Sequence, residues 1–144
     1  VWVDWRSPSS SLLQRALVLH PPCLVAGMGC NSGTESREIL GLLDGVLREA
    51  GLARASLSTL ATTSLKRDEA GLILAARTLG VPMVCIESSS LDQEEAPNPS
   101  DTVRKHTGAS SVCEAAAMHR AGTTRLLVEK KKSENATLAL ALEV

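Results

Sequence analysis

Two hydrophobic periodicities alternate along most of the chain. Short apolar runs typical of buried strands are each followed by a longer stretch in which apolar residues recur every three or four positions, as on one face of a helix. The expected strands are residues 23–28, 56–61 and 81–86. The expected helices are residues 35–50, 67–79 and 112–121, and each ends at a glycine, the residue best suited to a left-handed cap.

The first two helices have clear inward faces. The residues expected to face the core are Ile39, Leu43, Val46 and Leu47 in the first helix, and Leu72, Ile73, Ala76 and Leu79 in the second. A single helical turn is expected within residues 88–100, and Ser100 is expected to cap a short helix that ends near Gly108.

The end of the chain changes the pattern. The segments "TTRLLVE" and "ATLALALE" are strand-like, and the charged segment "KKKSEN" between them predicts an antiparallel hairpin. Strands that alternate with helices indicate right-handed crossovers. The expected fold is therefore α/β: a three-layer α/β/α sandwich with a mixed, mostly parallel sheet ending in an antiparallel hairpin.

Residues 1–20 differ from the remainder of the chain. A short strand-like segment, "VWVDW", is followed by Pro8 and a serine run that is typical of a linker. We expect residues 1–20 to be the tail of an upstream domain and a linker, and residues 21–144 to form the main domain.

Composition excludes several classes of function. The net charge of −1 offers no electrostatic attraction for nucleic acid or an anionic membrane, and no apolar run is long enough to span a bilayer. Phe and Tyr are absent, so the core must be aliphatic. None of the four cysteines falls in a C-x-x-C pair, which favours reduced thiols in the cytoplasm and no metal site.

A glycine-rich segment, residues 27–34, follows the first strand. Gly27, Gly29 and Gly33 form G-x-G-x-x-x-G, one residue longer than the dinucleotide fingerprint. The next strand ends in "LATT" without an acidic residue for a ribose, and no Lys-Ser or Lys-Thr pair follows Gly33, as a Walker loop would require. Two interpretations remain open: an anion site built from loop amides and a helix N-terminus, or a turn that needs glycine for steric reasons.

The topology predicts that three loops meet. The carboxyl ends of parallel strands share one edge of the sheet, so residues 27–34, 62–69 and 87–90 should lie together there. Cys30 in this group is either an activated thiolate near a helix start or a small buried side chain. Lys66 either forms a surface ion pair with Glu69 or binds a ligand carboxylate.

Glu114 is a candidate general acid or base. However, residues 111–114 match the S-x-x-E capping box, in which Ser111 and Glu114 would bond to the backbone at the start of the helix. Ser100, which follows Pro99, fits the first position of a helix in the same way.

Five segments in this order resemble one protein family. They are "GMGCNSGT", "SLKRDEAGL", "NPSDTV", "GASSVCEAAAM" and "LLVEKKKSENATLALA". The chain resembles the C-terminal domain of CbiG and its stand-alone relative CobE, both of cobalamin biosynthesis. Cys113 departs from the alanine usual before the glutamate, and Asn31 and Ser32 stand where basic or small residues are common.

The resemblance implies a cobalt-precorrin-5A hydrolase function, in which a δ-lactone is opened and acetaldehyde is released. It implies Glu69 or Glu114 as the base. The implied substrate-binding residues are Gly27, Gly29, Cys30, Gly33, Thr34, Lys66 and Ser100. The helix N-terminus at Ser111 is a further candidate for holding a carboxylate.

The resemblance also implies the partners. They are an anionic corrin precursor, which carries its own cobalt so that no cofactor is required, and the N-terminal domain of the same full-length chain, with self-association left open. Two other functions remain: a non-catalytic module that binds a corrinoid or assembles the pathway's enzymes, and a Rossmann-like domain that binds a phosphorylated metabolite.

Overall fold

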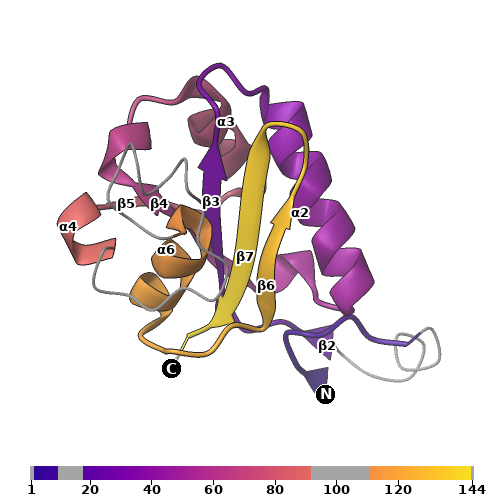
Figure 1. The fold of residues 1–144 in the computed structure, drawn as a ribbon. Coiled ribbons are helices and arrows are strands. Elements are labelled where there is room, and N and C mark those ends of the chain that lie inside the picture. Colours follow the sequence, from indigo (N-terminus) through magenta and orange to yellow (C-terminus); the bar gives the residue numbers. More distant parts are fainter. Residues whose placement is uncertain (1, 10–17, 92–110, 144) are drawn as a thin grey trace.

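A computed structural model describes residues 2–9, 18–91 and 111–143 (Figure 1). The strands are β1 (Trp2–Val3), β2 (Val18–Leu19), β3 (Leu24–Cys30), β4 (Leu57–Thr63), β5 (Met83–Ile86), β6 (Val128–Lys132) and β7 (Ala136–Leu142). The helices are α2 (Ser36–Ala50), α3 (Ala70–Leu79), α4 (Ser88–Leu91) and α6 (Val112–Ala121), with short 3-10 turns η1 (Arg54–Ser56) and η2 (Ser64–Lys66).

The main sheet has five strands in the order β5-β4-β3-β7-β6. β3, β4 and β5 are parallel, whereas β7 is antiparallel to both β3 and β6. Four of the five strands therefore run in one direction and β7 alone is reversed, which confirms the predicted mixed, mostly parallel sheet. The hairpin enters the sheet by its second strand, because β7 pairs with β3 along its whole length and leaves β6 at the edge.

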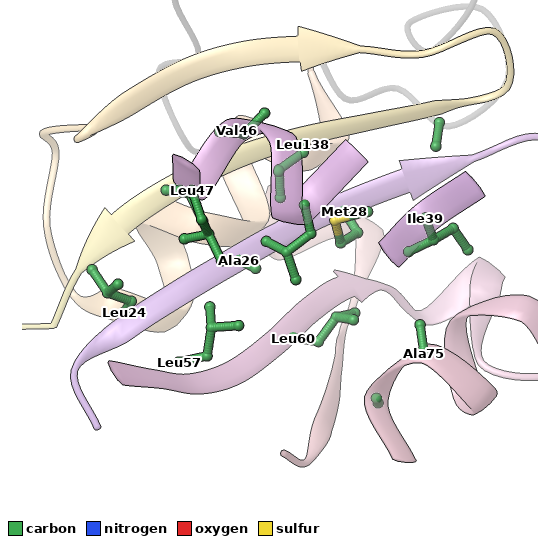
Figure 2. Close-up of a cluster of buried hydrophobic side chains, with 14 of the residues drawn as sticks. Leu24, Ala26, Met28, Ile39, Val46, Leu47, Leu57, Leu60, Ala75 and Leu138 are labelled. Carbon is green, nitrogen blue, oxygen red and sulfur yellow. The ribbon is translucent and has the colours of Figure 1, made fainter. Parts of the chain in front are cut away.

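Helices cover both faces of this sheet (Figure 1). Alternate residues of β3 point to opposite faces. Leu24, Ala26 and Met28 join the cluster beneath α2 and α3, and Val25 joins the cluster beneath α6. Figure 2 shows the first cluster, where side chains of α2 lie over the strands. The three-layer α/β/α sandwich is therefore confirmed, with cores built mainly from aliphatic side chains.

Most helix boundaries agree with the prediction. The four residues expected to face inward from α2 are all buried, and Gly51 ends the helix with a φ of 68°. α3 begins at Ala70, later than predicted, because the chain first forms η2. Its buried stripe includes Ala75, while Ile73 and Leu79 are only half-buried.

The predicted position of the hairpin turn is wrong. β6 begins at Val128 and contains all three lysines that were assigned to the turn, so the connection to β7 is only residues 133–135. An edge strand accepts lysines because their side chains reach solvent. The shorter turn is held by Glu38 of α2, which accepts hydrogen bonds from Ser133 and Asn135.

The first residues pack against the domain. β1 pairs with β2 in parallel, and the Ala53 amide donates to the Trp5 carbonyl over 2.6 Å. Asp4 is buried, and its hydrogen bond from the Arg6 guanidinium lowers the pKa of Asp4 to about 2. The assignment of residues 1–20 to an upstream domain and linker stays a prediction.

Candidate functional site

The loops after β3, β4 and β5 meet at one edge of the sheet, as predicted. The Gly33 amide donates to Glu69 Oε1 over 2.6 Å, which joins the first loop to the second. The hydroxyls of Thr63 and Ser88 lie 3.3 Å apart and join the second loop to the third. We call this edge the rim, and define it by residues 30–34, 63–69 and 87–88.

Residues 31–34 form a tight turn within the rim. The Thr34 amide donates to the Asn31 carbonyl over 3.2 Å, and Gly33 has a φ of +81°, a conformation that favours glycine. The Asn31 amide donates to the Asn135 carbonyl over 2.8 Å. The amides of Asn31, Gly33 and Thr34 therefore all have acceptors within the protein. An incoming carboxylate must displace Glu69 before it can use the Gly33 amide.

The other two glycines of the loop have a packing role. A Cβ atom on Gly27 would lie 1.9 Å from the Cys113 carbonyl oxygen, and one on Gly29 would lie 2.9 Å from Thr137 Oγ1. Glycine at position 27 lets the backbone of α6 approach β3 closely. The steric interpretation therefore accounts for Gly27 and Gly29.

Lys66 lies half-buried at the end of η2. Within the described ranges, Lys66 and Glu69 form no ion pair, and one Glu69 oxygen accepts the Gly33 amide instead. Burial raises the pKa of Cys30, and the positive charge of Lys66 offsets part of that rise. The predicted surface pair is therefore not formed.

The Cys30 side chain is half-buried beside Lys66 and Glu69. Burial raises the pKa of this thiol, and the effect of burial outweighs the opposing charge of Lys66. Cys30 is therefore expected to be a neutral thiol at neutral pH. The interpretation as a small, partly buried side chain fits better than that of an activated nucleophile.

Glu114 and Ser111 lie in a different environment. Glu114 is 0 % exposed, and its Oε2 accepts the Lys130 amide over 3.0 Å, at the register shift of β6 between Val128 and Lys131. Ser111 makes no side-chain cap, and its hydroxyl lies 3.8 Å from Cys113 Sγ. The predicted capping box is wrong, because the irregular edge strand supplies the amide that binds the glutamate.

The remaining predicted residues are placed as follows. Thr34 is buried, and its hydroxyl donates to the Asn31 carbonyl over 2.6 Å, so this side chain stabilises the turn. Ser100 lies outside the described residues. Glu38, Ser133 and Asn135 were not among the predicted site residues, and they bind one another beside the 31–34 turn. The segment "SEN" indicated a turn, but nothing in the sequence indicated its partner on α2.

A hollow outside the rim involves none of the predicted site residues. An open hollow of about 400 Å³ lies between α2 and β6 and is lined by Val46, Glu49, Ala50, Leu127, Val128, Glu129, Lys130 and Lys131. In the described part of the chain, no three His, Cys, Asp or Glu residues gather to hold a metal ion. The helices described there are too short or too polar to cross a membrane.

This fold and rim define an α/β sandwich whose candidate site lies at the carboxyl ends of its parallel strands. Residues 24–141 match the family "Cobalamin synthesis G C-terminus". The chain therefore belongs to this family, as the resemblance in sequence predicted.

Three relatives show how far the similarity extends. A cobalt-precorrin-5A hydrolase of Priestia megaterium is 37% identical over 139 residues, which are 96% of this chain but 37% of that protein. Protein CobE of Sinorhizobium sp is 35% identical over 121 residues, covering 82% of this chain and 79% of CobE. A crystal structure of CobE, from the cobalamin biosynthetic pathway, superposes with a TM-score of 0.79 at 36% identity, covering 85% of this chain and 92% of that one.

Proposed function

We propose that the rim binds an anionic cobalt-corrin precursor and contributes to the cobalt-precorrin-5A hydrolase reaction. The observation that supports this most directly is the placement of Lys66. Lys66 lies half-buried in the loop after β4, which bonds to the loops after β3 and β5, and its charge acts on Cys30. It forms no ion pair in the described part of the chain. The chain spans only 37% of the hydrolase that it resembles, so catalysis by the whole protein is part of the proposal.

The chemistry of a corrin precursor suits this rim. Such a molecule is an apolar disc with acetate and propionate groups at its periphery. A charge-assisted hydrogen bond from Lys66 would hold one carboxylate. The Gly33 amide cannot bind a second carboxylate and orient Glu69 at the same time. It would orient Glu69 if the rim is catalytic, and it would bind the carboxylate if the rim only binds the corrin. The substrate brings the cobalt, so the proposal assigns no cofactor to the protein.

Between the two predicted bases, the rim favours Glu69. Its Oε1 is oriented by the Gly33 amide, and the second carboxylate oxygen would take a proton from water as that water attacks the lactone carbonyl. Cleavage of the ring C–O bond then gives the free acid and an alkoxide, which takes the proton back from Glu69 and becomes a hydroxyl. Glu114 is buried and already bound to the Lys130 amide, so its place in the structure fits a stabilising role.

A second candidate is a non-catalytic corrinoid-binding or assembly module. Two observations favour it. The two predicted reactive groups at the rim are Glu69, whose carboxylate is already bound to an amide, and Cys30, whose pKa is raised by burial. In addition, the chain covers 92% of a CobE crystal chain, so a protein of nearly this size occurs without the remaining parts of the longer relative.

An upstream domain is the proposed partner if this chain acts as part of a hydrolase. Val3 and Leu19 are register partners in the β1–β2 pair and are 57% and 47% exposed. These apolar side chains offer a surface for the N-terminal domain of a longer chain. The proposed location is the cytoplasm.

Titration with dicyanocobyrinic acid, a cobalt corrin with free carboxylates, tests the binding site. We expect Lys66→Gln to weaken binding about tenfold, the loss of one charge-assisted hydrogen bond, with an unchanged melting temperature. Visible absorption of the corrin measures the Kd. Arg77→Gln removes an equal charge from the far end of α3 and should leave the Kd unchanged. Equal affinity in wild type and Lys66→Gln would contradict the proposed site.

An acetaldehyde assay separates the two candidate functions. Turnover of cobalt-precorrin-5A by this chain, abolished in Glu69→Gln, would support catalysis at the rim. Corrin binding by this chain without acetaldehyde, together with turnover by a full-length relative, would favour the non-catalytic module.

A further inference from the structure

Asn135 connects the 31–34 turn to helix α2. Its carbonyl accepts the Asn31 amide over 2.8 Å and the Thr34 hydroxyl over 3.4 Å, and its Oδ1 accepts Asn31 Nδ2 over 3.2 Å. On the other side, Glu38 Oε2 accepts the Asn135 amide over 2.7 Å, and Glu38 Oε1 accepts Asn135 Nδ2 over 3.0 Å. One asparagine therefore uses both its backbone and its side chain to bind two elements.

Ser133 completes the arrangement. Its hydroxyl donates to the Glu38 carboxylate and accepts the Ala136 amide over 3.2 Å. Glu38 thus binds both ends of the three-residue turn between β6 and β7. We call Glu38, Ser133 and Asn135 the hairpin bracket. The 31–34 turn lies between this bracket and Glu69, so it is held from two sides.

We infer that Glu38 and Asn135 are positioning residues, which hold the 31–34 turn in the conformation that receives a corrin carboxylate. The inference rests on the proposed function. Neither residue needs to touch the ligand, because Glu38 acts through Asn135, and Asn135 acts through Asn31 and Thr34.

The charge of Glu38 supports a positioning role. A carboxylate near an anion site should weaken anion binding by repulsion. The carboxylate of Glu38 nevertheless faces the hairpin turn and is bound by Ser133 and Asn135, which together lower its pKa. The negative charge of Glu38 therefore orders a turn that lies beside the proposed site for negative ligands.

Two matched variants separate positioning from electrostatics. Glu38→Gln removes one negative charge and replaces one acceptor oxygen with an NH2 donor. The side chain can then no longer accept all three hydrogen bonds from Ser133 and Asn135. Glu35→Gln removes the same charge from the exposed residue that precedes α2 and has no side-chain cap hydrogen bond. If only charge matters, both variants bind dicyanocobyrinic acid more tightly. If Glu38 positions the turn, Glu38→Gln binds about tenfold more weakly while Glu35→Gln binds as well as wild type or better.

Amide hydrogen exchange supplies a readout that does not depend on the ligand. We expect the Asn31 and Asn135 amides to exchange about tenfold faster in Glu38→Gln and in Asn135→Ala, with Glu35→Gln unchanged. Binding is compared at a temperature where circular dichroism shows every variant folded. Dicyanocobinamide, in which amides replace peripheral carboxylates, should bind weakly to all of them.

The outcomes distinguish the inference from the proposed function. A wild-type chain that binds neither corrin overturns the proposed function and with it the inferred role in binding. Wild-type binding with unchanged exchange in Glu38→Gln overturns the inference alone. Faster exchange with unchanged affinity also overturns it, because the turn would then be ordered without consequence for the ligand.

Discussion

The same residue types occur in two regions of this domain with opposite surroundings. The contact between α6 and the sheet contains Gly27, Cys113, Glu114 and Lys130, and every described side chain of α6 from Val112 to Met118 is buried. Glu114 there accepts a backbone amide. Burial raises the pKa of the Cys113 thiol to about 11. This region therefore has a stabilising role.

The rim contains the corresponding set of Gly33, Cys30, Glu69 and Lys66. Its glycine provides a left-handed turn, its cysteine is half-buried, and its glutamate and lysine are partly exposed at a junction of loops. The comparison teaches that residue type did not decide which glutamate or cysteine is accessible to a ligand. Burial decides which of these side chains a ligand can reach, and burial depends on which strand or helix covers the residue. Substitutions in the α6 contact should therefore change stability, and those at the rim should change chemistry and binding.

Gly27→Ala should have the largest effect on the α6 contact. The new Cβ atom would meet backbone atoms of Cys113 and Ala117 at 1.9 and 2.7 Å, so the helix must move away from β3. We expect a loss of more than about 3 kcal/mol in the free energy of unfolding, measured by urea denaturation. Gly45→Ala, on an exposed part of α2 with nothing within 4 Å, is the matched control and should gain about 0.5 to 1 kcal/mol.

Glu114→Ala should have the next largest effect. The variant leaves the Lys130 amide without this acceptor and creates a small cavity, so we expect a loss of about 2 to 3 kcal/mol on unfolding. Thermal and urea denaturation measure the loss, and Glu49→Ala at an exposed position of α2 is the control. Unchanged stability combined with lost acetaldehyde release would instead identify Glu114 as the base. The α6 contact, and not the rim, would then contain the reacting group.

Thiol alkylation should give the smallest effect and compares the two regions directly. We expect iodoacetamide at pH 8 to modify Cys30 slowly and to leave Cys113 unmodified, as read by peptide mass spectrometry. Lys66 lowers the pKa of Cys30 and Glu69 raises it. Lys66→Ala should therefore slow alkylation of Cys30 a few-fold, and Glu69→Gln should accelerate it. Identical rates in the two variants would contradict the closeness of these three side chains.

Local sequence signals predicted most of the fold. Helix α6 has the predicted bounds, and α2 begins one residue later than predicted. Both helices end where predicted, because Gly51 and Gly122 follow the last residues of their periodic apolar faces. The convergence of three loops also followed from topology alone. The turn of the hairpin was misplaced because Glu38, far away in the sequence, binds Ser133 and Asn135.

Long-range contacts explain the errors at the site. The S-x-x-E pattern of residues 111–114 predicted a local cap, but an amide of β6 binds Glu114 instead. The glycines of the loop resembled a ligand cradle, but two of them accommodate α6 and the neighbouring strand β7. Short sequence patterns record which bonds are locally available, and the partner from another strand decides which of them form.

The central place of β7 has a consequence for how the protein reaches its native state. Leu24 pairs with Leu142, so the middle of the sheet closes only when two segments that lie far apart in the sequence meet. Such long-range closure makes folding slow relative to helix formation. During synthesis on the ribosome, one edge of β3 would stay unpaired until residues 136–142 emerge. A chain truncated before these residues would expose that edge to pairing with other chains and would tend to aggregate.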